Sequence, residues 1–222
     1  MTLGVLGGMG VQATGLFYNM LASLQSVETE QQYTDVLLYS KPSIPDRSAY
    51  ILKRSAESPF HSLLDGVQTL QNAGVSCIAI PCITAHYFYD ELAAASSTPI
   101  INILTAVARH AHAQGIKKIG VLATAGTLHA GLLQKAFAEF DICVVTPKDE
   151  NTVMQVVYEV KRGAHVSHTH LQHMSKELYQ AGAQAVLLGC TELSIIAASA
   201  PHEYIDALQV LATCALAACT SK

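Results

Sequence analysis

Positive charge is scarce in this sequence. The 13 Lys and Arg residues are outnumbered by 17 Asp and Glu residues, which gives a formal net charge of −4. That balance argues against nucleic acid as a partner. Charged residues of both signs make up only 14% of the chain, whereas hydrophobic residues make up 50%. The 222 residues can therefore bury a sizeable core, as one large domain or two small ones.

Targeting signals and long apolar runs are lacking too. The first residues, MTLG, do not form the basic n-region of a signal peptide. The longest apolar run near the C-terminus, about residues 207–219, is interrupted by Gln209 and is too short to span a bilayer. We therefore expect a cytoplasmic protein without a membrane partner.

The spacing of metal-binding motifs is missing as well. Six cysteines are scattered along the chain without the pattern of a zinc site, and in a cytoplasm we expect reduced thiols. Four histidines lie close together, but no acidic or cysteine residue accompanies them. We interpret them as a solvated surface cluster and expect no metal site. These histidines are His165, His168, His170 and His173.

What the sequence does contain is a steady alternation of short apolar segments and amphipathic ones. Continuous apolar strands between such helices are typical of parallel sheets covered on both faces. The expected strands are residues 3–7, 34–39, 77–80, 100–103, 118–122, 142–145 and 185–188. The expected helices are roughly residues 12–25, 59–73, 86–95, 104–114, 128–139, 152–162, 171–181 and 207–219.

The two halves of the chain repeat one layout. The segment LGVL at residues 3–6 opens the first half and IGVL at residues 119–122 opens the second, each followed by a glycine-rich turn and a helix. Gly74 precedes an apolar strand that ends at Cys82, eight positions on, and Gly182 precedes one that ends at Cys190, again eight positions on. Ligands bind at the carboxyl ends of strands in open α/β sheets, so we expect the two thiols to face one another if the halves do.

Two opposed thiols predict acid–base chemistry at a carbon atom. A thiol between a strand and a helix meets backbone N–H groups and the positive end of the helix dipole, and both favour the thiolate. One thiolate can take a proton from a carbon while the other thiol delivers a proton to the opposite face. That exchange inverts a stereocentre without a cofactor.

Four motifs spread over essentially the whole chain carry a resemblance. They are GGMGVQAT at residues 7–14, IPDRSAY at 44–50, PCITAHYF at 81–88 and GCTEL at 189–193. Together they resemble the cofactor-independent aspartate/glutamate racemase family. The resemblance implies two pseudo-symmetric parallel-sheet α/β domains with the active site in the cleft between them, a homodimer, and no cofactor. It also implies that Cys82 and Cys190 are the catalytic acid/bases, with Cys190 deprotonating the L enantiomer and Cys82 the D enantiomer.

The same resemblance assigns two cations to the substrate. Arg47, in the segment resembling the family's Pro-Asp-Arg, and Lys161 match family positions that bind a carboxylate of a small acidic amino acid. The assignment is physically reasonable because a dicarboxylic amino acid needs cations to replace its lost hydration.

Five further positions are implied to line the substrate site. Thr84, Thr124 and Thr191 lie in turns expected to offer hydroxyl or N–H donors to the α-carboxylate. Met9 and Gly10 are expected to form part of the wall at the first turn.

The roles of three residues close to the cysteines in sequence are left open. Ile83 stands where the family has an asparagine whose amide binds the substrate; because isoleucine has no donor or acceptor, we expect slow turnover of acidic substrates or a substrate with an apolar group there. His86 either contacts the Cys82 thiol or packs against or caps its helix. Glu192 either orients donors around the Cys190 thiol or has a structural role.

A dinucleotide site is a weaker interpretation of the first turn. Residues 8–13, GMGVQA, fit the G-x-G-x-x-A fingerprint after a strand. Such a site needs an acidic residue at the end of the second strand, whereas Asp35 begins that strand. The sequence therefore does not favour it.

These observations lead to one functional prediction. We expect racemisation of aspartate or glutamate by an enzyme whose first half is residues 1–102 plus 207–222 and whose second half is residues 103–206. The alternatives are an isomerase or decarboxylase of a related diacid in the same superfamily, or a non-catalytic protein that binds a dicarboxylate.

Overall fold

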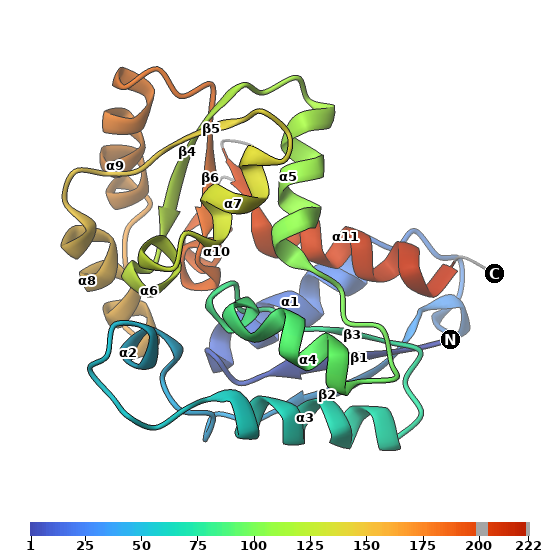
Figure 1. Ribbon diagram of the computed structural model, residues 1–222. Helices are drawn as coiled ribbons and strands as arrows, with labels where there is room; N and C mark the ends of the chain where they lie inside the picture. Colours follow the sequence, from blue (N-terminus) through green and yellow to red (C-terminus); the bar gives the residue numbers. More distant parts are fainter. Residues whose placement is uncertain (199–203, 221–222) are drawn as a thin grey trace.

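The computed structural model describes residues 1–198 and 204–220, which form two parallel sheets flanked by helices (Figure 1). The first sheet has the order β2-β1-β3, in which β1 is the central strand. Its strands are β1 (Thr2–Gly7), β2 (Asp35–Ser40) and β3 (Cys77–Ala79). The second sheet has the order β5-β4-β6-β7 and is also parallel. Its strands are β4 (Lys118–Ala123), β5 (Cys143–Val145), β6 (Ala185–Gly189) and β7 (Ile205–Asp206).

Helices cover both faces of each sheet. On the first sheet, α3 covers one face, and α1 and α11 cover the other. On the second sheet, α8, α9 and α10 (Thr191–Ala197) cover one face, and α5, α7 (Leu132–Ala138) and α11 cover the other. The long helices are α1 (Val11–Ser23), α3 (Phe60–Asn72), α5 (Ile103–Ala113), α8 (Glu150–Lys161), α9 (Thr169–Gln180) and α11 (Ala207–Thr220).

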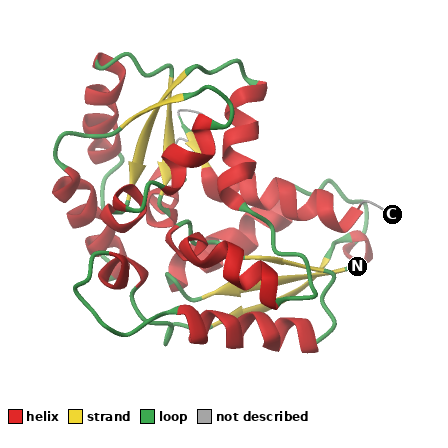
Figure 2. Ribbon diagram, viewed as in Figure 1, coloured by secondary structure: helices red, strands yellow, loops and turns green. Residues whose placement is uncertain are grey.

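Both sheets direct the carboxyl ends of their strands toward α2, α6 and α10 (Figure 2). Chain segments from the two sheets therefore converge there. The shorter elements lie after these ends, except η1, which precedes β2. The short elements are η1 (Glu30–Gln32), α2 (Arg47–Ile51), η2 (Thr84–Phe88), α4 (Tyr89–Ala95), α6 (Ala125–His129), α7 (Leu132–Ala138) and α10 (Thr191–Ala197).

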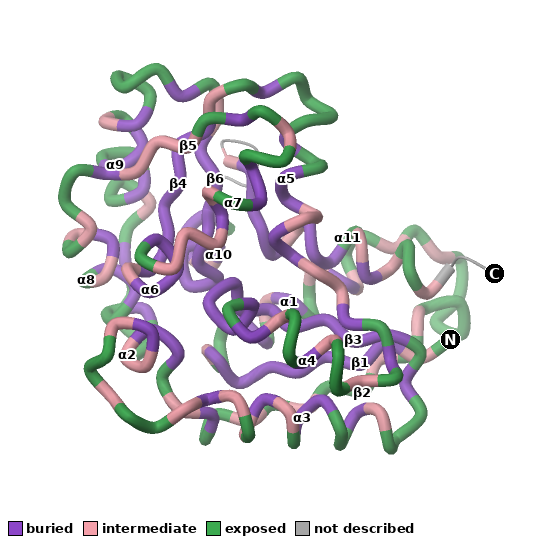
Figure 3. The backbone as a smooth tube through the Cα atoms, viewed as in Figure 1, coloured by how far each residue is buried: buried purple, intermediate pink, exposed green. Residues whose placement is uncertain are grey.

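The alternation of side chains along a strand decides which core cluster each strand residue joins. Val5 and Leu6 are neighbours on β1, yet they belong to clusters on opposite faces, as the two-residue period of a strand requires. On β4, Val121 and Leu122 divide in the same way. The cluster containing Val5 and Val121 spans both sheets through α5 and α11, and Figure 3 shows the buried segments concentrated in the strands and the helix sides that face them. Because the halves share a core, the division at residues 103 and 207 stays a prediction.

Two predicted elements are wrong in detail. The strand expected at residues 100–103 is reduced to a single bridge between Ile78 and Ile100. The reason is Asn102, whose side-chain oxygen accepts hydrogen bonds from two backbone amides and so starts α5 at Ile103. The helix expected at residues 128–139 is divided into α6 and α7 because Gly131 takes a positive φ of 66° between them. The sequence patterns also do not predict α2, α10 or β7.

No helix within residues 1–198 and 204–220 combines the length and apolar character needed to cross a membrane.

Candidate active site

The two cysteines singled out by the sequence occupy equivalent places. Gly74 ends the turn between α3 and β3 with φ +79°, and Gly182 ends the turn between α9 and β6 with φ +88°. Each strand then leads to a cysteine: Cys82 lies just before η2, and Cys190 is the N-cap residue of α10. Both cysteines are only 6% exposed. Glycine suits both turns because it adopts these backbone angles without the strain that a Cβ brings.

Both thiols line one small cavity between the two sheets. Its volume is about 20 Å³, which is room for roughly one water molecule and far too little for an amino acid. A wider cavity of about 510 Å³ adjoins it and shares Met9, Arg47 and Lys161 as walls. A substrate therefore reaches the thiols only if the walls between these cavities move.

The other residues implied by the resemblance surround the same space. All of them except Gly10 line the cavity of the thiols, and Gly10 lines the adjoining one. The residues of the first group are Met9, Arg47, Ile83, Thr84, Thr124, Lys161 and Thr191.

Cys190 has a carboxylate as its direct neighbour. Its Sγ donates a hydrogen bond to Glu192 Oε2 at 3.0 Å, and the Glu192 side chain is only 3% exposed. Burial raises the pKa of Cys190 well above its usual value, and the negative Glu192 raises it further, while Lys161 opposes them. The prediction of a thiolate at the start of this helix is therefore wrong for Cys190 in the free protein. Desolvation and the negative charge of Glu192 outweigh the dipole of a short helix.

Cys82 has an apolar setting instead. Its Sγ makes no hydrogen bond within the described ranges 1–198 and 204–220, and the residue belongs to a hydrophobic cluster with Met9 and Ile80. Ile83, beside it, is 2% exposed and offers no polar atom from its side chain. Both ring nitrogens of His86 point to backbone carbonyls, Nδ1 at 2.9 Å from the oxygen of Cys82 and Nε2 at 3.3 Å from that of Ile101. Burial lowers the pKa of His86, so the ring is neutral and structural.

Arg47 is a buried cation held by backbone carbonyls. It is 8% exposed, and its two terminal nitrogens donate to the carbonyl oxygens of Ile44, Pro45 and Met9 at 3.1, 3.0 and 3.4 Å. Its Nε is buried without a partner, and no carboxylate of the described residues lies within 4.0 Å of the guanidinium. The residue thus presents an orientated positive charge to the cavity.

Lys161 supplies a second cation from the end of α8. Its Nζ lies 4.0 Å from Glu192 Oε1, and its side chain is 29% exposed. Burial has the largest effect on the pKa of Lys161 and lowers it, as the nearby Arg47 also does to a smaller extent. The negative Glu192 and, less strongly, the two cysteines raise it, and together they place the pKa above its usual value. The amine is therefore charged at neutral pH.

Three threonine hydroxyls join the two halves beside the thiols. Thr84 comes from the first half, and Thr124 and Thr127 come from the second. Their oxygens lie 2.9–3.0 Å apart in every pairing, and all three residues are buried. Three hydroxyls can satisfy one another in a ring, so this cluster holds donors ready for an anion that replaces one of the mutual bonds.

Sequence reasoning missed several residues of the site. Thr127 carries no motif signal, and only folding places its hydroxyl against Thr84. Asp46 and Ser48 line the cavity on either side of Arg47, and their place in the IPDRSAY segment was the available signal.

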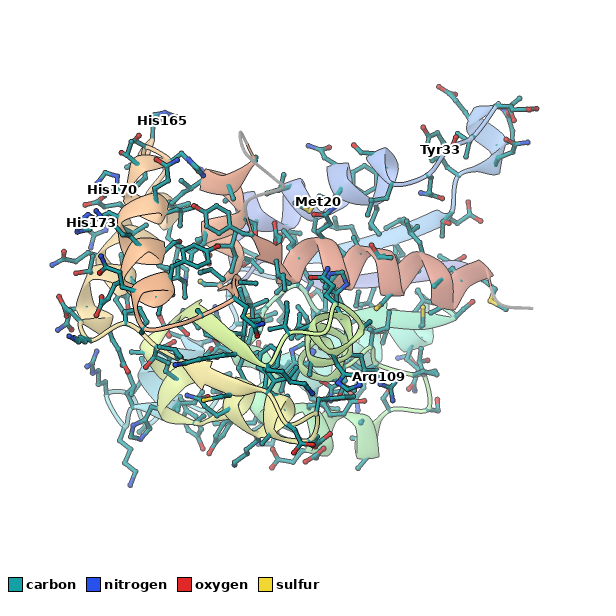
Figure 4. All side chains as sticks on the ribbon, turned by 90° about the horizontal axis from the view of Figure 1, so that it is seen from above. Met20, Tyr33, Arg109, His165, His170 and His173 are labelled. Atoms are coloured by element: carbon teal, nitrogen blue, oxygen red, sulfur yellow. The ribbon has the colours of Figure 1, made fainter. Side chains whose placement is uncertain are left out.

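The structure also places the residues considered for a dinucleotide site and the histidine cluster. Asp35 begins β2 opposite Thr2, so it lies at the far end of the strand from the glycine-rich turn, and a dinucleotide site lacks its acidic residue. No group of three or more His, Cys, Asp or Glu side chains that could hold a metal ion occurs in the described part of the chain. The labelled histidines His165, His170 and His173 lie along the outer side of the molecule (Figure 4).

The sequence is similar to those of named racemases. Broad specificity amino-acid racemase RacX of Bacillus subtilis is 28% identical over 204 residues, which cover 87% of this chain and 86% of the relative. A glutamate racemase of Deinococcus radiodurans is 27% identical over 184 residues, which cover 77% of this chain and 63% of the relative.

Solved structures confirm the expected fold of two parallel-sheet α/β units. Picrophilus torridus aspartate racemase superposes with a TM-score of 0.88 at 26% identity, covering 100% of this chain and 95% of the other. A putative Asp/Glu racemase from Yersinia pestis gives a TM-score of 0.79 at 26% identity and covers 99% of both chains. The sequence profile of the Asp/Glu/Hydantoin racemase family matches residues 6–218. Since that match runs from β1 into α11, the chain belongs to the Asp/Glu/Hydantoin racemase family and is an amino-acid racemase.

Proposed function

We propose that this racemase inverts the Cα of aspartate or glutamate by two-base proton transfer between Cys82 and Cys190, without a cofactor. The observation that carries the proposal is the pair of thiols on one cavity, one delivered by each sheet. Two groups on opposite sides of a carbon can serve as base and acid in the same turnover.

The proton balance of the step is simple. In the L-to-D direction, the Cys190 thiolate takes the Cα proton and becomes a thiol, and the Cys82 thiol delivers its proton to the opposite face and becomes a thiolate. The electron pair of the broken C–H bond forms the new C–H bond. The reverse reaction starts from the state in which the forward reaction ends.

The cations support an acidic substrate. Arg47 is buried and held by backbone carbonyls without a carboxylate partner, and Lys161 lies beside it on the same cavity. A substrate carboxylate between them would satisfy the free Nε of Arg47. Thr84, Thr124 and Thr191 would bind the α-carboxylate, with Met9 and Gly10 forming the wall.

Ile83 favours neutral amino acids as a second substrate class. Its apolar side chain lines the cavity, where it would leave a polar group of aspartate or glutamate unpaired. The Bacillus subtilis relative is named as a broad-specificity racemase. A panel of substrates therefore needs both acidic and neutral amino acids.

The test is proton exchange in deuterated water. Purified enzyme is incubated with single enantiomers of each amino acid, and NMR follows the loss of the Cα–H signal while chiral chromatography follows inversion. The proposal expects both signals for aspartate or glutamate, and loss of inversion in Cys82→Ala and in Cys190→Ala. Cys143→Ala is the control, because that thiol is exposed and remote from the cavity. Full racemisation by either site variant would refute the two-base scheme.

We also propose a cytoplasmic homodimer that binds neither nucleic acid nor membranes. An exposed apolar edge supports the dimer: among the strands of residues 1–198 and 204–220, β2 pairs with β1 alone, and Tyr33, Leu37 and Leu38 are 41%, 39% and 37% exposed. Light scattering after size-exclusion chromatography tests it, and a single species of 23.7 kDa would contradict it.

A further inference from the structure

Two cysteines outside the candidate active site lie with their sulfur atoms close together. Cys77 begins β3, Cys219 lies one residue before the end of α11, and their Sγ atoms are 3.6 Å apart. This is the one hydrogen bond between two thiols among the described residues, which include all six cysteines of the chain. Neither residue lines the cavity of Cys82 and Cys190 or the wider cavity beside it. The pair is therefore separate from the site of the proposed racemisation.

We propose that Cys77 and Cys219 form a reversible disulfide when a peroxide reaches the protein, and that this bond fastens α11 to the first sheet. The sulfur atoms of a disulfide lie about 2.0 Å apart, so these two must approach by about 1.5 Å. Cys219 lies in the last turn of α11, and the ends of a helix are its least constrained parts. The approach therefore needs a shift of the helix end and leaves β3 in place.

The unequal burial of the two thiols sets the order of the chemical steps. Cys77 is 5% exposed, whereas Cys219 is partly exposed and packs against the core. Burial raises the pKa of Cys77, and the neighbouring Cys219 raises it further, so Cys77 keeps its proton at neutral pH. Because a more exposed thiol is easier to reach, we expect the peroxide to oxidise Cys219 first.

The two steps balance with hydrogen peroxide as the oxidant. In the first step, an S–O bond forms at Cys219, the O–O bond breaks, and the thiol proton leaves with the other oxygen as water, which gives a sulfenic acid. In the second step, the sulfur of Cys77 attacks that of Cys219, an S–S bond forms, and the hydroxyl group leaves with the Cys77 proton as a second water. The two sulfurs together lose two electrons, and the peroxide gains them.

A dithiol reverses the reaction by thiol–disulfide exchange: it returns two hydrogen atoms to the cysteines and becomes a disulfide itself. A bond that forms with an oxidant and is removed by a dithiol agrees with cysteines that are otherwise reduced.

The disulfide would fasten a helix that packs on both sheets (Figure 1). Leu208 of α11 belongs to the apolar cluster that also contains Val5 of the first sheet and Val121 of the second. The bond would join residues that are 142 positions apart in the chain. Such a link restricts the unfolded chain and so favours the folded one, with a larger effect for a longer loop. We therefore expect the oxidised protein to resist unfolding better than the reduced protein.

Mass spectrometry tests the bond directly and needs no substrate, so its outcome does not depend on the proposed racemisation. Reduced wild-type protein is treated with hydrogen peroxide, its remaining thiols are alkylated in denaturant, and fragmentation of the digested peptides identifies the linked cysteines. We expect a link between Cys77 and Cys219 whose yield is independent of protein concentration, and its loss on treatment with dithiothreitol. Oxidation that gives no such link, or links only between chains, would overturn the inference.

Two variants of α11 form a matched pair for the effect on stability. Cys219→Ala removes the partner of Cys77, whereas Cys214→Ala changes the other partly buried cysteine of the same helix. In the wild type and in Cys214→Ala, peroxide should raise the thermal midpoint of unfolding by about 5–15 °C, and dithiothreitol should reverse the rise. In Cys219→Ala the midpoint should not rise. An equal rise in Cys219→Ala, or no rise in the wild type, would contradict a bond that fastens the helix.

Discussion

The two halves of the site deliver the same reactive group along the same backbone path but into different surroundings. In each half, a helix, a glycine with positive φ and a strand lead to a buried cysteine. Two residues further on, the first half has Thr84 and the second has Glu192. Cys82 therefore lies among apolar groups, whereas Cys190 bonds to a carboxylate. The backbone repeat sets where the thiols lie, and the buried carboxylate beside Cys190 adds to the effect of burial in raising the pKa of that thiol.

The largest expected effect is the loss of either thiol. Cys82→Ala and Cys190→Ala should each abolish racemisation, because one face of Cα loses its proton donor or acceptor. The two variants should differ in Cα–H exchange: Cys190→Ala should retain exchange for the D enantiomer only, and Cys82→Ala for the L enantiomer only. NMR in deuterated water measures both.

Equal exchange of both enantiomers in both variants would break this comparison, since it would mean that neither thiol is committed to one face.

Next in size is the contribution of the two cations. Arg47→Ala and Lys161→Ala each leave a substrate carboxylate without a charged partner, a loss of about 2–5 kcal/mol for a desolvated pair, or roughly 30- to 5,000-fold in kcat/KM. Arg47 should lie at the upper end, because it is 8% exposed and the Lys161 side chain is 29% exposed. Steady-state kinetics with aspartate and with a neutral amino acid measure the difference.

A similar loss on both substrates would show that these residues act through folding rather than through the substrate's charge.

A smaller effect is expected at Ile83, in the apolar surroundings of Cys82. Ile83→Asn should raise kcat/KM for aspartate or glutamate by about 10- to 100-fold, because an unpaired polar group in the site costs about 1–3 kcal/mol. The variant should still need both thiols, which the double variants with Cys82→Ala and Cys190→Ala check. No gain on any acidic amino acid would mean that another group already satisfies the substrate.

The smallest expected effect concerns the contact between the halves. A Cβ at Gly126 of α6 would lie 2.7 Å from the backbone Cα of Ser48 in α2. Gly126→Ala should therefore lower the free energy of unfolding by about 1–3 kcal/mol. Gly15→Ala in α1 is the control: its Cβ meets nothing within 4 Å, so a gain of about 0.5–1 kcal/mol is expected. Denaturant unfolding measures both, and equal shifts would remove the argument for a tight contact.

Much of the fold was predictable because it depends on local pattern. Continuous apolar strands and amphipathic helices predicted both parallel sheets, and of the predicted strands only that at residues 100–103 failed, where the Asn102 cap starts a helix. The short helices α2 and α10 escaped prediction because they have few residues and little periodicity to detect. Their positions depend on contacts between distant segments.

The sequence by itself determined where the two thiols would lie, because the matched spacing of Gly74 to Cys82 and Gly182 to Cys190 defines the same turn and strand in each half. Only the tertiary structure decided their chemistry. The contact of Cys190 with Glu192 depends on how α10 turns its first residues inward, and the ring of Thr84, Thr124 and Thr127 depends on the two halves meeting. Desolvation and charge act over a few ångströms in space, so no local pattern in the chain carries them.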